Sequence, residues 1–292
     1  MKRFPSSALL VAALAVSVVT ALLLTISTAL VGCGGGATKS PPAVEPRARE
    51  IFALRGEVMK TSLLAKAAYS GLTEDEARRR LAPALAAAAE VERLMSRFVP
   101  DSDVSRLSSA AAGTPVHIDP RTARVLALAA EIHSRSGGAY DVTVGPLVGL
   151  YKYTGREMKR PPSDAEIADA LKRVGTDKLI LDAKRSTAAL RAGGMLVDLS
   201  SIAKGFAVDQ AMEALRRGGA EAALVEIGGE VRAYGLKPDG SPWKVGIRHP
   251  RSENLLGTLD ASDRAVATSG DYQKYRSEER RVGKEGRSRW SP

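Results

Sequence analysis

The chain has 292 residues and a formal net charge of +10 at pH 7, a length sufficient for one sizeable core or two lobes. Its basic residues are spread rather than clustered, which does not favour nucleic-acid binding and suits an anionic ligand or a membrane surface equally well. The single cysteine excludes an intrachain disulfide, and three scattered histidines do not support zinc catalysis or a serine–histidine hydrolase.

The N-terminus has the layout of a secretory signal, because two basic residues precede an uncharged apolar run over 8–31. Such a run is also long enough to span a membrane. A Leu-Val-Gly-Cys sequence ending at Cys33 has the form of a bacterial lipobox and favours cleavage followed by lipidation of that cysteine. We therefore expect a lipoprotein signal peptide over 1–32, a flexible tether over 33–50, and a lipid-anchored protein of the cell envelope that faces the periplasm or the exterior.

Three sequence signals predict where helices begin. Two are capping boxes, in which a Ser or Thr is followed three residues later by Glu, and the third is an Asp–Pro pair. They are Thr73 with Glu76, Asp119–Pro120, and Ser163 with Glu166. Pro83 offers a later alternative start for the first helix, and the helix after Ser163 is predicted to end at Gly175.

Short apolar or alternating runs bounded by turn residues predict the strands. The predicted strands lie within 52–68 and at 178–182, 187–191, 222–227, 230–235 and 243–247. The last three also fit a plain meander.

A strand-to-helix junction lies between these groups. An apolar run with one carboxylate predicts a short buried strand that ends at Asp198, and helical spacing over 204–217 predicts a helix after it. The N–H groups at the helix start, the hydroxyls of Ser200 and Ser201, and the ammonium of Lys204 together offer a cradle for an anion such as a phosphate. A purely structural interpretation, in which these side chains only cap the helix, is open as well.

Four segments stand in the same order as in one protein family. They are Met95–Leu107, Gly137–Val148, Val197–Asp209 and Ala265–Tyr272. With these segments the chain resembles the ApbE-type FAD:protein FMN transferases, flavin-trafficking enzymes, over roughly 55–275.

The resemblance implies a fold and a reaction. The fold is α+β, with ApbE-like, T-fold-related mixed sheets and packed helices over 51–275, and FAD lies in a cleft near Asp198. In the reaction, FMN passes from FAD through a phosphoester bond to a Thr or Ser of an exported flavoprotein of an electron-transport complex, AMP leaves, and Mg²⁺ assists.

The resemblance also implies site residues. Flavin or nucleotide contacts fall on Met59, Phe98, Ala139, Tyr140, Asp141, Asp198 and Lys204, the metal ligand is Ser201, and Gly228 and Gly229 form a turn near the cleft. Met59 and Phe98 also fit ordinary core residues, and the glycines at 137–138 also fit a helix C-cap. The chain departs from the family pattern at Lys60, where glycine is usual, and at Ser108, where asparagine is usual.

The resemblance ends after Tyr275. Residues 276–292 are highly charged and aperiodic, and such a segment cannot bury enough surface to order itself. It is either a natural disordered tail or foreign sequence joined to a truncated reading frame, and we favour truncation because the family motifs stop mid-pattern. We accordingly expect the chain as written to bind flavin weakly and to transfer no FMN. Robust Mg²⁺-dependent transfer by this chain would contradict truncation and make Asp271 and Asp141 the first candidate metal ligands elsewhere in the chain.

Three other functions remain open on sequence grounds. One is an FAD pyrophosphatase, in which water replaces the acceptor hydroxyl, and another is a lipoprotein that binds FAD without turnover. The third is a solute-binding lipoprotein unrelated to flavin, which fits the lipobox and tether but not the four segments.

Overall fold

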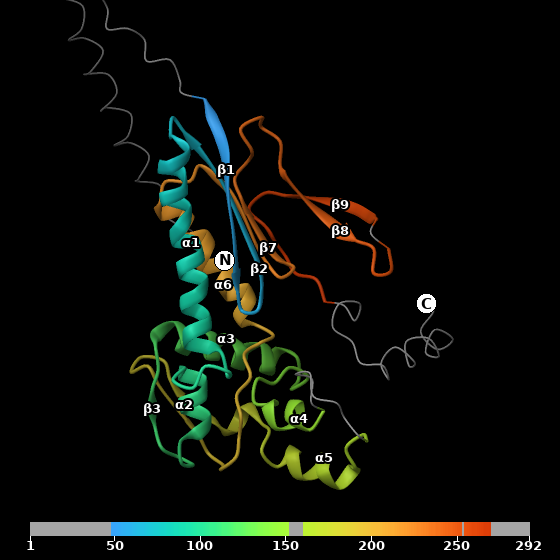
Figure 1. Cartoon of the computed structure of the whole chain (residues 1–292). Coiled ribbons are helices and arrows are strands. Elements are labelled where there is room, and N and C mark those ends of the chain that lie inside the picture. The colour runs from blue at the N-terminus through green and yellow to red at the C-terminus, as the bar shows by residue number, and fades with distance from the viewer. Residues whose placement is uncertain (1–47, 152–159, 253, 270–292) are drawn as a thin grey trace, which may run out of the picture. The chain divides into compact units, whose positions relative to one another are not determined.

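A five-stranded antiparallel sheet with two helices packed against it forms the main layer of the molecule (Figure 1). The computed structural model describes residues 48–151, 160–252 and 254–269. In spatial order the strands are β1 (Arg49–Val58), β2 (Thr61–Ser70), β6 (Ala222–Ile227), β7 (Glu230–Tyr234) and β10 (Ala265–Val266). The single run predicted within 52–68 is thus a hairpin of two strands, whose register pairs Val58 with Thr61.

Two helices, α1 (Glu74–Met95) and α6 (Ala203–Arg217), pack on one another and on this sheet. Small residues on the buried face of α1 allow the helices to approach closely: Ala77, Ala84 and Ala88 are fully buried. The predicted capping box is confirmed, because Thr73 N–H donates to Glu76 Oε2 at 2.9 Å and Glu76 N–H donates to Thr73 Oγ1 at 3.3 Å. The alternative start at Pro83 is wrong.

Pro83 lies inside α1 on its exposed side. A proline there removes one backbone donor, and the carbonyl left without that donor faces water rather than the core. The helix therefore continues through this position.

A second group of elements surrounds a three-stranded antiparallel sheet with the order β3-β5-β4. Its strands are β3 (Val116–His117), β4 (Leu179–Asp182) and β5 (Thr187–Leu190), and its helices are α2 (Asp103–Ser109), α3 (Pro120–Arg135), α4 (Gly145–Leu150) and α5 (Asp164–Leu171), with a 3-10 turn at Thr176–Lys178. The starts of α3 and α5 are confirmed by their caps. In α3, Arg121 N–H donates to Asp119 Oδ1 at 2.8 Å.

The end predicted for α5 is wrong, because the helix stops at Leu171 rather than Gly175. The chain leaves the helical path so that two backbone donors reach a neighbouring loop. Gly175 N–H donates to Thr143 Oγ1 at 2.7 Å, and Thr176 N–H donates to Asp141 Oδ2 at 2.9 Å.

The predicted strand at 243–247 is present but does not belong to the main sheet. As β8 (Trp243–Arg248) it pairs with β9 (Leu255–Ala261) in a separate two-stranded sheet, so the stretch is not a plain meander. Trp243 and Ala261 are buried in a second small core with residues of β2, β6 and β7, and the outer part of the hairpin is exposed. The architecture as a whole confirms the α+β fold class.

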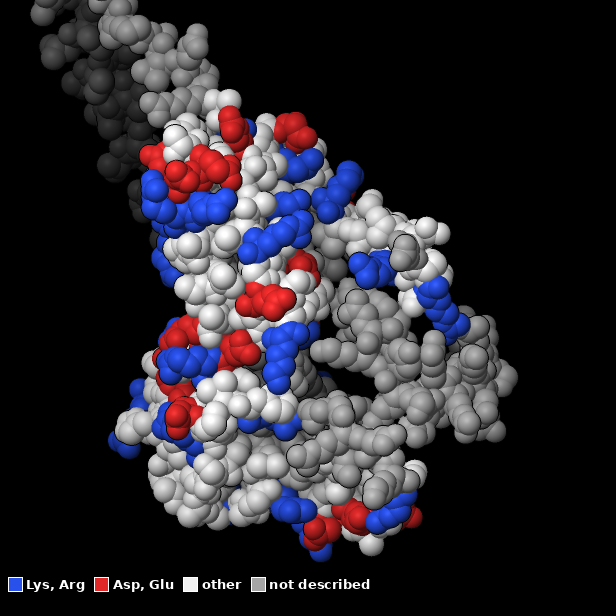
Figure 2. Space-filling view, in the orientation of Figure 1, with Lys and Arg blue, Asp and Glu red and all other residues white. Residues whose placement is uncertain are grey.

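Several predictions fall outside the described residues: the signal peptide, Cys33, the tether up to residue 47, Asp271 and the tail over 276–292. In the part of the chain that the structure describes, no helix combines the length and apolar character needed to cross a membrane. On the face shown in Figure 2, basic and acidic side chains are interspersed over the described part.

Candidate functional site

The segment before α6 is buried extended chain rather than a regular strand. Leu196 alone forms an isolated parallel bridge, to Val144, and Asp198 N–H donates to Val142 O at 2.7 Å. The predicted strand is therefore wrong, although the alternate residues Met195, Val197 and Leu199 are buried. Besides the Asp198 bond, Gly145 N–H donates to Leu196 O at 3.2 Å, so this side of the segment has only two backbone hydrogen bonds to the loop around 142–145 and no regular ladder.

Ser108 holds the same segment from α2. Its Oγ accepts a hydrogen bond from Val197 N–H at 3.1 Å. The serine that replaces the family's usual asparagine thus has a positioning role here.

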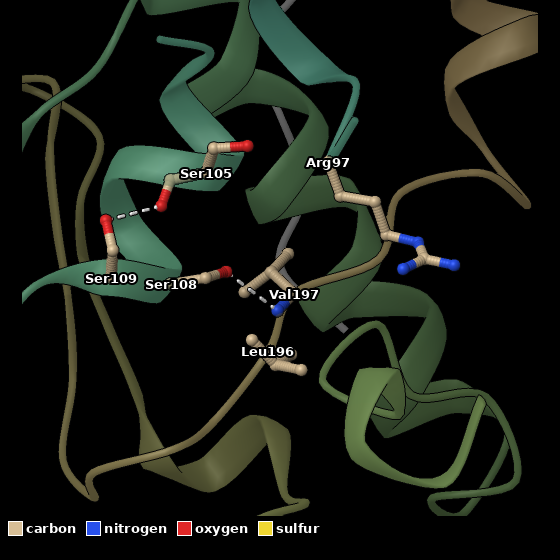
Figure 3. A pocket seen from close by; sticks show the side chains of 6 residues that line it. All are labelled: Arg97, Ser105, Ser108, Ser109, Leu196 and Val197. Atoms are coloured by element: carbon tan, nitrogen blue, oxygen red, sulfur yellow. Dashed lines mark hydrogen bonds between the residues drawn. The ribbon is translucent and has the colours of Figure 1, made fainter. Parts of the chain in front are cut away.

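A cavity of about 210 Å³ lies beside this segment, and Figure 3 shows Ser108 of α2 pointing toward Val197 in the extended chain. The cavity is lined by Arg97, Ser105, Ser108, Ser109, Leu196 and Val197. The Ser109 hydroxyl donates to Ser105 O at 2.8 Å, so it is used within α2. The cavity therefore lies between α2 and the residues that precede Asp198.

Helix α6 begins without a side-chain cap. Its N-cap residue is Ile202, and neither Ser200 nor Ser201, both exposed, caps the helix. Asp198 instead stabilises the turn that precedes α6, because its Oδ1 accepts a hydrogen bond from Ser200 N–H at 2.9 Å. The interpretation of the two serines as helix caps is therefore wrong, and their hydroxyls are left for other contacts.

Asp198 is nearly buried, with 6% of its side chain exposed, and Arg97 compensates its charge. Arg97 Nε lies 2.9 Å from Asp198 Oδ2, without the alignment of a hydrogen bond, so the contact is an ion pair. A buried carboxylate without such a partner is strongly disfavoured. Arg97 therefore belongs to the site, although the sequence did not single it out.

Phe98, next to Arg97, is 54% exposed, so its interpretation as a core residue is wrong. Two cations lie over its ring: the Arg97 guanidinium at 4.3 Å and the Lys60 ammonium at 4.7 Å from the centroid. Met59 is half-buried and packs against the main core, which fits the core alternative. Its N–H donates to Glu92 Oε2 of α1 at 2.8 Å.

The segment after α3 meets the junction through Tyr140. Its hydroxyl lies 3.0 Å from Ser201 Oγ, so two of the four motif segments touch directly. The glycines at 137–138 have φ of 62° and 85° and follow the C-cap of α3, so the C-cap alternative describes their geometry. Ala139 beside them is exposed.

Asp141 holds this loop in place. Its Oδ1 accepts the N–H and the hydroxyl of Thr143 at 2.7 and 2.6 Å, and its Oδ2 accepts Thr176 N–H. Burial alone raises the pKa of Asp141, but the hydrogen bonds from Thr143 and Thr176 outweigh it, and the net pKa is lowered. His133 Nδ1 lies 2.8 Å from Tyr140 O and 3.4 Å from Asp141 Oδ2, so the imidazole is used in holding this loop.

Lys204 lies in the first turn of α6 and pairs with Glu230. Its ammonium donates to both carboxylate oxygens, at 2.7 and 2.8 Å. Glu230 was not among the predicted site residues, although it directly follows the Gly228–Gly229 turn, which was the available signal. The pair joins this turn to the junction and fixes the ammonium.

The described part of the chain offers no ready set of carboxylate or imidazole ligands for magnesium. Within 48–151, 160–252 and 254–269, no three His, Cys, Asp or Glu side chains cluster as metal ligands. The predicted ligand Ser201 is a neutral hydroxyl already in contact with Tyr140. Mg²⁺ requires near-octahedral oxygen ligands, so these residues alone do not fit it.

Comparison with known proteins identifies the family. The family model described as ApbE matches residues 59–286. The chain belongs to the ApbE family. It is 35% identical over 235 residues to the FAD:protein FMN transferase of Haemophilus influenzae, covering 77% of this chain and 67% of that protein. A relative of the same name from Vibrio cholerae is 36% identical over 190 residues, which are 64% of this chain and 56% of that protein.

Solved ApbE structures share the fold. The flavin transferase ApbE from Vibrio cholerae superposes with a TM-score of 0.68 at 31% identity, covering 77% of this chain and 73% of that one. The ApbE protein from Thermotoga maritima gives a TM-score of 0.69 at 30% identity, over 77% and 72% of the two chains. The predictions of an ApbE-like fold and of membership in a family of transferase enzymes are confirmed.

Proposed function

We propose that this chain is an FAD:protein FMN transferase, the activity for which its ApbE relatives are named. The observation that carries the proposal is the convergence of three motif segments on the junction. Tyr140 contacts Ser201, Arg97 pairs with Asp198, and the backbones of Val142 and Asp198 are hydrogen-bonded. The fourth segment, from Ala265, contributes β10 to the main sheet. Membership in the family makes a solute-binding lipoprotein unrelated to flavin a poor alternative.

The proposed reaction is a phosphoryl transfer. The hydroxyl oxygen of an acceptor Thr or Ser bonds to the phosphorus of the FMN half of FAD, and the bond from that phosphorus to the bridging oxygen breaks. AMP leaves with the electron pair, and the hydroxyl proton passes to the AMP phosphate or to solvent. Positioning and neutralisation of charge supply most of the catalysis in such reactions. We propose an exported flavoprotein of an electron-transport complex as the acceptor.

Different side chains of the site contact the flavin ring and the charged part of the nucleotide. The exposed ring of Phe98 and the side chain of Met59 offer apolar surface to the flavin ring. Lys204, held by Glu230, and Asp198, held by Arg97, present fixed charges to the nucleotide. Because these charges are positioned before the ligand arrives, little reorganisation is needed on binding.

Magnesium dependence is part of the proposal. A bound Mg²⁺ would neutralise pyrophosphate oxygens and stabilise the leaving phosphate. The described residues offer Ser201, which contacts Tyr140, and Asp141, which follows Tyr140 in the chain and whose oxygens are already hydrogen-bonded to Thr143 and Thr176. They do not fit a complete site, so we derive no step through the metal.

We also propose that Cys33 is lipidated and anchors the protein to the cell envelope, facing the periplasm or exterior. The basic start, apolar run and lipobox support this. Processing that is blocked by globomycin, with a lipid-modified N-terminal peptide, is the expected result. An unmodified Cys33 with the apolar segment retained would contradict it.

The activity test is incubation with FAD, Mg²⁺ and an acceptor that carries the target Thr, followed by mass measurement of the acceptor. The proposal predicts an acceptor heavier by one FMN unit, and no change in a Thr→Ala acceptor. The Haemophilus influenzae transferase serves as the positive control. Release of free FMN and AMP would identify a pyrophosphatase, and unchanged FAD would identify a binding protein. An acceptor that this chain leaves unmodified while the positive control modifies it would contradict the proposed transfer.

A further inference from the structure

Two ion pairs join α6 to β7, and their polarities are opposite. Lys204 of the helix pairs with Glu230 of the strand, whereas Asp209 of the helix pairs with Arg232 of the strand. Both pairs tie the same two elements together, so they share any purely structural role. The Lys204–Glu230 pair lies at the first turn of α6, directly after the junction. This pair is therefore the one placed to act on a ligand.

In the Lys204–Glu230 pair, the carboxylate binds the ammonium through both oxygens but leaves one donor free. The two distances are 2.7 and 2.8 Å, and 34% of the lysine and 20% of the glutamate side chain are exposed. An ammonium has three N–H donors. The third has no partner in the part of the chain that the structure describes. A ligand oxygen can therefore accept from Lys204 while the carboxylate stays bound.

The hairpin between β6 and β7 fixes the position of Glu230. This residue begins β7 directly after the Gly228–Gly229 turn, and it pairs with Ile227 in the sheet. The turn is closed by Gly229 N–H, which donates to Glu226 Oε1 at 2.7 Å. The backbone that carries the Glu230 carboxylate is therefore held, and a ligand at Lys204 meets the carboxylate where it stands.

An anion on the free donor of Lys204 lies close to the carboxylate of Glu230. Two acceptors on one tetrahedral ammonium are about 4–5 Å apart. Like charges at that distance repel, and the repulsion grows with the charge of the ligand. Each phosphate of FAD is bridged on two sides and carries one negative charge, whereas a terminal phosphate carries about 1.5 to 2 at pH 7. Glu230 therefore disfavours a terminal phosphate more than a bridged one.

We propose that Glu230 is a specificity-determining residue that favours the pyrophosphate of FAD over the terminal phosphates of FMN and AMP at Lys204. This inference rests on the proposed function, in which Lys204 meets the nucleotide. In the transfer reaction FAD is the substrate, and AMP carries a terminal phosphate once the bridging bond has broken. The repulsion that selects the substrate therefore also promotes the release of this product.

The test replaces Glu230 by glutamine. Glutamine keeps an oxygen that accepts from Lys204, so the ammonium stays in place while the negative charge is removed. Asp209→Asn is the matched control, because it removes one negative charge from the other pair between α6 and β7. Asp209 lies about 7.5 Å further along the helix than Lys204. The full chain is titrated by calorimetry with FAD, FMN, riboflavin and inorganic phosphate, at low and at high salt.

We expect Glu230→Gln to raise the affinity for FMN roughly tenfold and that for FAD roughly threefold, because the removed repulsion scales with the charge of the ligand. Riboflavin, which has no phosphate, should bind as before, and high salt should reduce both gains. Asp209→Asn should leave the ratio of FAD to FMN affinity close to that of the unchanged chain. A merely structural role of Glu230 would not shift this ratio while sparing riboflavin.

Two outcomes with the flavins would overturn the proposal and leave flavin binding intact. One is a Glu230→Gln chain whose ratio of FAD to FMN affinity is unchanged, including a chain that binds all three flavins equally more weakly. The other is an equal shift of the ratio in Glu230→Gln and Asp209→Asn, because net charge alone would then be responsible.

The inorganic phosphate titration separates this proposal from the proposed function. An unchanged chain that binds no flavin would contradict the proposed function. Inorganic phosphate bound more tightly by Glu230→Gln than by the unchanged chain would then still support the role of Glu230. Phosphate bound equally by both chains, or by neither, would contradict that role as well.

Discussion

Two hairpin turns lie side by side at one end of the main sheet. Both are two-residue turns whose residues have positive φ, but the residues differ. Met59–Lys60 joins β1 to β2, and Gly228–Gly229 joins β6 to β7. Both residues of each turn have positive φ: 54° and 57° in the first, 58° and 99° in the second. Glycine adopts these angles freely, whereas Met and Lys do so under strain.

The two turns also differ in their support. Gly229 N–H donates to Glu226 Oε1 at 2.7 Å, a carboxylate of the same hairpin. Met59 N–H donates to Glu92 of α1, which is 33 residues away in sequence. The glycine turn is therefore closed locally, while the Met–Lys turn depends on a helix. The strained turn thus carries side chains of the site, with Lys60 over Phe98, and the hydrogen bond from α1 supports its conformation.

Gly228→Ala should have the largest effect on stability. A Cβ at this position would lie 2.8 Å from side-chain atoms of Thr61, whose branched side chain is stiff. Strain and overpacking together should lower the free energy of unfolding by about 2–4 kcal/mol in urea denaturation. In a Thr61→Ala background the same change should cost less, and an equal cost in both backgrounds would show that the clash contributes nothing.

Glu92→Leu should have an intermediate effect, because it leaves the half-buried Met59 N–H without its acceptor. We expect a loss of about 1–2 kcal/mol in the free energy of unfolding. Glu92→Gln is the matched control, since it keeps an oxygen acceptor and should lose less. Equal losses of unfolding free energy in Glu92→Leu and Glu92→Gln would show that the Met–Lys turn does not depend on the hydrogen bond from α1. The two turns would then not differ in their support.

Lys60→Gly should have the smallest effect on stability. Relief of backbone strain is offset by the entropy of glycine and by the lost cation–π contact, so the free energy of unfolding should change by less than about 1 kcal/mol. A loss well above 1 kcal/mol in thermal or urea unfolding would mean that Lys60 is a structural residue rather than one kept for the site.

Local signals in the sequence predicted most of the fold. A capping box or an Asp–Pro pair acts over three or four residues, and these located the starts of α1, α3 and α5. Strand β9 was missed because nearly all its residues are exposed and show no alternation of burial. The buried run before Asp198 was taken for a strand because apolar residues indicate burial, whereas a ladder depends on neighbours that the run does not reveal.

The candidate site was predictable only in part. The motif segments supplied Phe98, Tyr140, Asp198, Ser201 and Lys204, and the fold brings Tyr140 to Ser201. Arg97 and Glu230 were missed because their roles arise from ion pairs with residues far away in sequence. Such pairs follow from the tertiary fold, and the one local signal was the place of Glu230 directly after the Gly228–Gly229 turn. The roles of the predicted residues toward flavin stay predictions.

Calorimetric titration with FAD measures whether the junction before α6 is a flavin nucleotide site. Asp198→Ala and Lys204→Ala should each weaken binding by about 1.5–3 kcal/mol, because each removes a charged group held at the site. Lys244→Ala is the control, since Lys244 pairs with Asp260 at 2.7 Å in the separate β8–β9 hairpin and should leave affinity unchanged. Circular dichroism establishes that each variant is folded. FAD affinity that is the same in all three folded variants and the unchanged chain would contradict a flavin nucleotide site and reduce the junction to a structural turn.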